Sequence, residues 1–127
     1  MNNNNKHRSF FFTAALFNWT VAIIFLFAYQ PVFNLIGLSP VPQNPIYLHL
    51  FACLVALFGL GYYWVSLDFD KNRNIVYLGI VGKLSVFALP VGYYFAGSIS
   101  WQLPALTSVD LVFAMLFLNT LRQSPSS

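Results

Sequence analysis

The sequence predicts an all-α, polytopic membrane protein in which four transmembrane helices form one bundle. Three observations support this. Only 7% of the 127 residues are charged and 58% are hydrophobic, whereas a soluble domain carries about a quarter charged residues. Four apolar runs are each long enough to cross a bilayer, which takes about 20 helical residues. The basic residues flank these runs on one side only.

We predict that residues 1–127 form a single domain with four spans. The first run follows a basic start, as a signal peptide would. It is longer than a signal-peptide apolar region and no small-x-small cleavage site follows it, so we interpret it as a retained helix. The predicted spans are Phe10–Phe33, Ile46–Leu67, Ile75–Ala96 and Leu103–Leu121.

Three short connections separate the spans. Asn34–Pro45 contains one glycine and three prolines, which interrupt helices, while Asp68–Asn74 and Gly97–Gln102 are short and polar. Short connections make consecutive helices antiparallel neighbours.

The flanking charges predict the orientation. Five Lys and Arg residues flank the spans, and all of them fall on the same side of a four-span topology. The positive-inside rule therefore places both termini in the cytoplasm. Aromatic residues gather at both ends of the spans, as expected at the headgroup level. The charged residues are Lys6, Arg8, Lys71, Arg73 and Arg122, and the aromatic groups are Tyr29, Tyr47, Tyr93, Tyr94 and Trp101 outside and Tyr62, Tyr63, Trp64 and Tyr77 inside.

Lys83 and Asp110 are the charged residues that lie deep within the predicted spans. Such groups are costly in a membrane, and they usually face the bundle interior, pair with each other or line a pathway. At a rise of about 1.5 Å per residue, Lys83 lies about 12 Å from the inner edge and Asp110 about 10 Å from the outer edge. In a core about 30 Å thick their depths differ by about 8 Å, so an ion pair is within reach of a long lysine side chain.

Asn18 lies at nearly the depth of Lys83 in the first span and is a candidate third member of the group. Two interpretations of Lys83, Asp110 and Asn18 remain open. They are either a structural fastening between helices, or a proton or ion relay or an anchor for the polar head of a ligand.

Small residues share a face with both charges. Gly79 precedes Lys83 by four residues, and Ala114 follows Asp110 by four, so each pair lies on one side of its helix. Small residues promote close helix packing in lipid. The sequence leaves open whether the packing partner belongs to the same chain or to a second copy.

The sequence contains no G-x-x-x-x-G-K-[ST], H-E-x-x-H, G-x-S-x-G or C-x-x-C pattern. The single cysteine excludes an internal disulfide, and there is no Cys or His cluster with metal-ligand spacing. We therefore predict no catalytic residues, no metal site and no cofactor. The few basic residues adjoin apolar runs and do not indicate binding to nucleic acid.

Gly59-x-Gly61-Tyr62 and Gly79-x-x-Gly82-Lys83, with the size and the four spans, resemble the small four-helix bacterial membrane proteins grouped as DoxX-like. The resemblance covers the layout of most of the chain and implies a bacterial inner (plasma) membrane and partnership with a larger complex. It transfers no catalytic residue.

These observations favour a non-enzymatic accessory or hydrophobic-ligand-binding membrane component. The expected partners are the lipid bilayer, further copies or a larger membrane complex, and a hydrophobic ligand. One alternative is a small oligomeric proton-coupled transporter, since ionisable groups lie within the membrane. The other is a membrane subunit of a quinone-linked oxidoreductase, which the DoxX-like resemblance implies.

Overall fold

The computed structural model describes residues 3–125, and the described chain folds into five α-helices without β-strands. Four of the helices are long and apolar enough to cross a membrane. This confirms the prediction of an all-α, four-span bundle. The helices are α1 (Asn3–Phe27), α2 (Tyr29–Ile36), α3 (Ile46–Leu67), α4 (Arg73–Phe95) and α5 (Gln102–Gln123).

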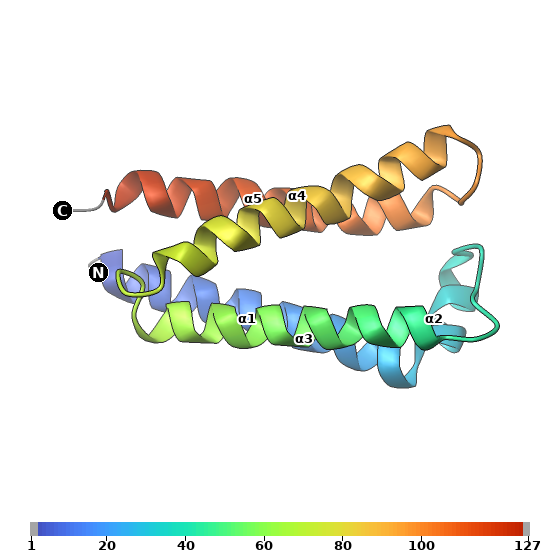
Figure 1. Ribbon diagram of the computed structural model, residues 1–127, viewed down its shortest axis with the longest axis horizontal. Helices are drawn as coiled ribbons and strands as arrows, with labels where there is room; N and C mark the ends of the chain where they lie inside the picture. Colours follow the sequence, from blue (N-terminus) through green and yellow to red (C-terminus); the bar gives the residue numbers. More distant parts are fainter. Residues whose placement is uncertain (1–2, 126–127) are drawn as a thin grey trace.

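The first apolar run differs from the single helix predicted for Phe10–Phe33. It breaks at Ala28, and its last part forms the separate short helix α2. Pro31 explains the break, because proline has no N–H to donate to the carbonyl of Phe27 and its ring would clash with that carbonyl. The chain turns at this point, so α2 lies across the end of α1 (Figure 1).

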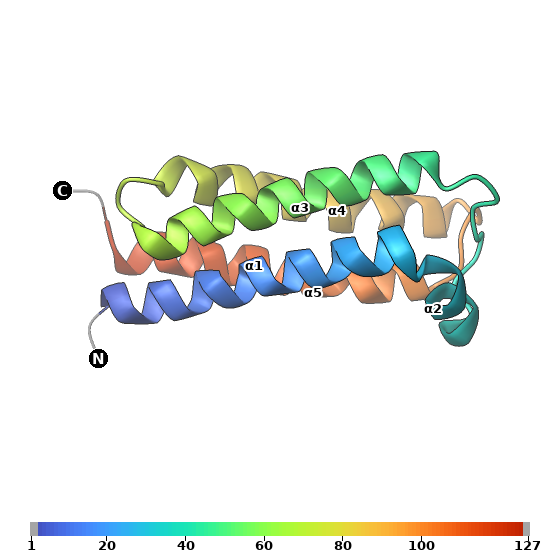
Figure 2. The ribbon, with the colours of Figure 1, turned by 90° about the horizontal axis from the view of Figure 1, so that it is seen from below.

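The four long helices form two layers. Helices α1 and α3 pack against each other in one layer, and α4 and α5 pack in the other. Figures 1 and 2 show this arrangement from two directions at right angles. The turn between Leu67 and Arg73 leads the chain from one layer to the other.

The two ends of the bundle differ in charge. The ends of the described chain lie beside the α3–α4 turn, and we call this the terminal end (Figure 1). The five flanking basic residues belong to the first turns of α1, the α3–α4 turn and the last turn of α5, so all of them lie at the terminal end. The sides of the long helices expose large apolar residues, which indicates contact with lipid.

The buried core is concentrated in the half of the bundle near the terminal end. All four long helices and the α3–α4 turn contribute to it. Its large aromatic rings fill the space between the layers, and such rings contribute most of the buried area of a core. The core residues are Phe11, Ala14, Ala15, Tyr62, Val65, Phe69, Val76, Phe117 and Leu121.

The other half of the bundle is less tightly packed between the layers. Within the described chain, no residue of α4 beyond Lys83 is buried, and Thr107 is the only buried residue of α5 before Asp110. The layers diverge in this direction in Figure 1. At this far end Ser39 and Ser100 join the connecting loops, with N–H···O distances of 3.0 Å from Ser100 N to Ser39 O and 2.9 Å from Ser39 N to Ser100 Oγ.

Candidate functional site

Lys83 and Asp110 form an ion pair at the boundary between the packed and the open half of the bundle. Lys83 Nζ lies 2.8 Å from Asp110 Oδ1. The lysine side chain is 5% exposed and the aspartate 17%. The ion pair therefore joins α4 and α5 at a depth where an unpaired charge would be very costly.

Asn18 joins the pair from the other layer. Its Oδ1 accepts a hydrogen bond from Lys83 Nζ at 3.3 Å, and its Nδ2 donates to the backbone carbonyl of Val55 at 3.1 Å. The structure thus brings together all three residues that the sequence singled out. Because Asn18 belongs to α1 and Val55 to α3, the group connects all four long helices.

Three aromatic rings surround the lysine ammonium. Nζ lies 5.0 Å from the ring centroid of Phe113, 5.3 Å from that of Phe17 and 5.5 Å from that of Tyr62. These distances suit cation–π attraction, which is stronger away from water. Tyr62 is 1% exposed, so its predicted place in the interfacial aromatic belt is wrong. It lies in the core, where its ring packs against Lys83 and Phe117.

Glycines allow the helices to approach closely around this group. A Cβ on Gly79 would lie 2.8 Å from Tyr62 Cε1, and a Cβ on Gly59 would lie 2.6 Å from Trp19 Nε1. Because Gly59 has no side chain, the Trp19 indole lies close to α3 and donates its N–H to the carbonyl of Ala56 at 3.2 Å. The side chains that pack against these two glycines therefore belong to the same chain and not to a second copy.

The neighbouring hydroxyl groups stay within their own helices. Ser85 Oγ donates to Val81 O, and Thr107 Oγ1 lies within hydrogen-bonding distance of Leu103 O. Neither residue joins the charged group. Lys83, Asp110 and Asn18 thus form a hydrogen-bonded group with members in both layers.

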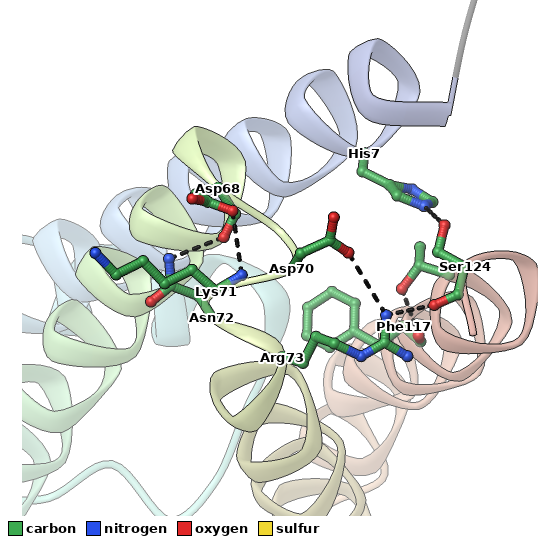
Figure 3. A network of polar contacts seen from close by, with 9 residues as sticks. His7, Asp68, Asp70, Lys71, Asn72, Arg73, Phe117 and Ser124 are labelled. Atoms are coloured by element: carbon green, nitrogen blue, oxygen red, sulfur yellow. Dashed lines mark hydrogen bonds and ion pairs between the residues drawn. The ribbon is translucent and has the colours of Figure 1, made fainter. Parts of the chain in front are cut away.

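A second polar network lies at the terminal end (Figure 3). The Arg73 guanidinium donates to the carbonyl of Ser124 and lies 3.9 Å from Asp70 Oδ1. His7 Nε2 lies 2.8 Å from Ser124 Oγ, a hydrogen bond in which either atom can be the donor depending on the histidine tautomer. The His7 ring packs on Phe69 with 4.5 Å between the centroids. This network ties the end of α5 to α1 and to the α3–α4 turn.

Two cavities open between α1 and α3 at the terminal end. The smaller, of about 180 Å³, includes Asp68 and Asp70 in its lining. The larger, of about 560 Å³, is lined by residues of α1 and α3 alone. Neither cavity is lined by Lys83 or Asp110.

No protein-family model matches the chain, and no curated protein or solved structure matches it either. The ring residues around Lys83 were not anticipated from the sequence. Phe17 directly precedes Asn18, and Phe113 lies three residues after Asp110. Helical spacing would have identified Phe113 as a neighbour of Asp110, but adjacent residues of a helix do not share a face, so spacing gave no signal for Phe17.

Proposed function

We propose that this protein is a non-enzymatic accessory component of a larger membrane assembly, and that it docks onto a transmembrane helix of a partner chain. The proposed docking surface is a small-residue face formed by Ala88 and Gly92 of α4 and by Ala96, which directly follows the helix. The three residues follow one another at intervals of four, and all are exposed. That spacing places them on one side of the helix.

Gly92 is the observation on which this proposal rests. Among the described helical residues, the other four glycines each have a neighbour within 4 Å of an added Cβ, whereas Gly92 has none. A glycine within a helix costs about 1 kcal/mol relative to alanine. In membranes, the close packing that small residues allow against a neighbouring helix offsets this cost. The face around Gly92 has the composition of such a contact and no partner within the described chain.

The burial of the four spans supports the same conclusion. In the most apolar window of each helix, 28% of α1 and 33% of α3 is buried, against 17% of α4 and 17% of α5. The α4–α5 layer therefore offers more free surface. The Lys83–Asp110 pair is already hydrogen-bonded inside the bundle, which favours the structural interpretation of that pair over a relay.

The orientation and location are part of the proposal. The DoxX-like resemblance suggests a bacterial inner membrane. The basic residues at the terminal end favour cytoplasmic termini by the positive-inside rule. Reporter fusions at Ser127 and Val41 test this orientation. We expect cytoplasmic activity at Ser127 and periplasmic activity at Val41, and the reverse pattern would contradict the proposal.

Photocrosslinking in native membranes tests the docking surface. A benzophenone side chain at Ala88 should give one discrete heavier adduct with a protein. Gly92→Leu should abolish this adduct because the bulky side chain blocks close approach, whereas Gly92→Ala should retain it. The same probe at Val112, an exposed position of α5, serves as the control and should give no such band.

Other adducts would overturn the proposal. An adduct of two identical chains would replace docking to a partner with self-association. Adducts with lipid or a small molecule alone would favour the hydrophobic-ligand interpretation. Substrate-driven proton flux in liposomes containing the purified protein would favour the transporter alternative.

A further inference from the structure

The larger cavity at the terminal end has features of a binding site that neither the charged group nor the docking surface uses. It has a volume of about 560 Å³ and lies between the first turns of α1 and the last turns of α3. Arg8, Ser9 and Ser66 contribute polar groups to its lining. Because both helices cross the membrane, their ends place this cavity at the level of the lipid headgroups.

The deeper part of the same cavity is apolar and continues onto the side of the bundle. Phe12 and Tyr63 line this part, whereas Leu67, the last residue of α3, lies at about the level of Arg8. Phe12 is 43% exposed and Leu67 is 56% exposed. Phe12 and Tyr63 face each other across the two helices, with 6.3 Å between their ring centroids. A molecule in the cavity would therefore meet a cation at the membrane surface and apolar side chains below it.

The larger cavity is lined by a cation and by no carboxylate. The Arg8 guanidinium forms no ion pair or hydrogen bond with any described residue. Arg8 also lines the smaller neighbouring cavity, which includes Asp68 and Asp70, but neither aspartate lines the larger one. An anion in the larger cavity would thus meet an unpaired arginine. Arginine suits a phosphate group because its planar fork can donate two parallel hydrogen bonds.

We propose that the cavity between α1 and α3 binds an anionic phospholipid, with the phosphate on Arg8 and an acyl chain along Phe12 and Tyr63. The combination of one cation with an apolar surface that opens toward the bilayer favours a lipid over free phosphate. Basic pockets between transmembrane helices bind anionic headgroups in this way. The occupancy of this site at the terminal end of the α1–α3 layer would then depend on the lipid composition of the leaflet there.

Native mass spectrometry of the purified protein from mixed micelles provides the test. The probes are phosphatidylglycerol and phosphatidylcholine with identical acyl chains, supplied in equal amounts. We expect the wild type to retain phosphatidylglycerol preferentially. Arg8→Gln should reduce that preference about fivefold, since the attraction between one basic side chain near the membrane surface and an anionic lipid changes binding by about this factor. Arg122→Gln removes the same charge from the same end outside the cavity and should leave the preference unchanged.

A second variant tests the cavity independently of charge. Ser9→Leu fills the cavity from an exposed position of α1 and should also reduce retention of phosphatidylglycerol. Inorganic phosphate at the same concentration should not displace the lipid.

Three results would overturn the proposal. Equal loss with Arg8→Gln and Arg122→Gln would show unspecific attraction to the charged end. Unchanged retention with Arg8→Gln would exclude the arginine. Displacement by inorganic phosphate would assign the site to a free anion.

Discussion

Replacing Asp110 by leucine should destabilise the protein far more than replacing Asp110 and Lys83 together. The single change leaves the Lys83 ammonium 5% exposed with only the amide oxygen of Asn18 at 3.3 Å as a polar partner. At 2.8 Å and an effective dielectric constant of about 20, the lost attraction amounts to about 6 kcal/mol before desolvation is considered. Measured costs of stranding one member of a buried pair are about 3–5 kcal/mol, which is the range we expect.

Lys83→Met should cost less than Asp110→Leu. Asp110 is more exposed, at 17% against 5%, so a stranded carboxylate can be hydrated more readily than a stranded ammonium. The double variant Lys83→Met with Asp110→Leu removes both charges and should lie within about 1 kcal/mol of the wild type, since apolar residues of similar size often replace a buried pair without loss.

Thermal unfolding of the detergent-solubilised protein provides the assay. The two single variants should melt well below both the wild type and the double variant. Asp70→Asn is the control, because its side chain is 79% exposed and 3.9 Å from Arg73, and such surface pairs contribute less than about 1 kcal/mol. Additive effects of the two single changes would refute an interaction between Lys83 and Asp110.

Three further predictions concern close packing and the terminal network. Gly79→Ala should cost about 1–3 kcal/mol, because the added methyl group would lie 2.8 Å from a ring atom of α3, whereas Gly92→Ala should not lower the melting temperature. Trp19→Phe keeps an aromatic ring but removes the indole hydrogen bond to a carbonyl of α3, and should lower stability by about 1 kcal/mol. Arg73→Gln should speed hydrogen exchange in the last turn of α5, because the guanidinium holds the carbonyl of Ser124; unchanged exchange there would show that this turn is held by other contacts.

Much of the fold follows from hydropathy and charge. The predicted second span, Ile46–Leu67, coincides with α3, and the other predicted boundaries near α4 and α5 differ by one or two residues. A long apolar run signals a membrane helix strongly, because every backbone group in lipid must be hydrogen-bonded internally. The break at Ala28 was missed because the run stays apolar across it. Pro31 was the available signal.

Counting residues along the helices predicted that the charged residues lie near one another, whereas the other features of the site depend on how the helices pack. Counting residues placed Asn18 at nearly the depth of Lys83, and Asp110 within about 8 Å of that depth, since an α-helix has a fixed rise. It could not show which way each side chain points. Tyr62 illustrates this limit, because a tyrosine near the end of a span suits either a headgroup or a core position, and only the packing of α3 against Gly79 places it in the core. The cavity beside Arg8 likewise depends on how α1 and α3 meet.

A distance measurement by solid-state NMR in lipid bilayers tests most directly whether the ion pair joins α4 to α5 inside the membrane. The chain contains three lysines and three aspartates, so ¹⁵N labels on lysine Nζ and ¹³C labels on aspartate Cγ leave few pairs to distinguish. We predict strong nitrogen–carbon dephasing from one pair, consistent with the 2.8 Å contact, and its loss in Asp110→Asn. Dephasing in the wild type no greater than in Asp110→Asn would contradict the ion pair and the account built on it.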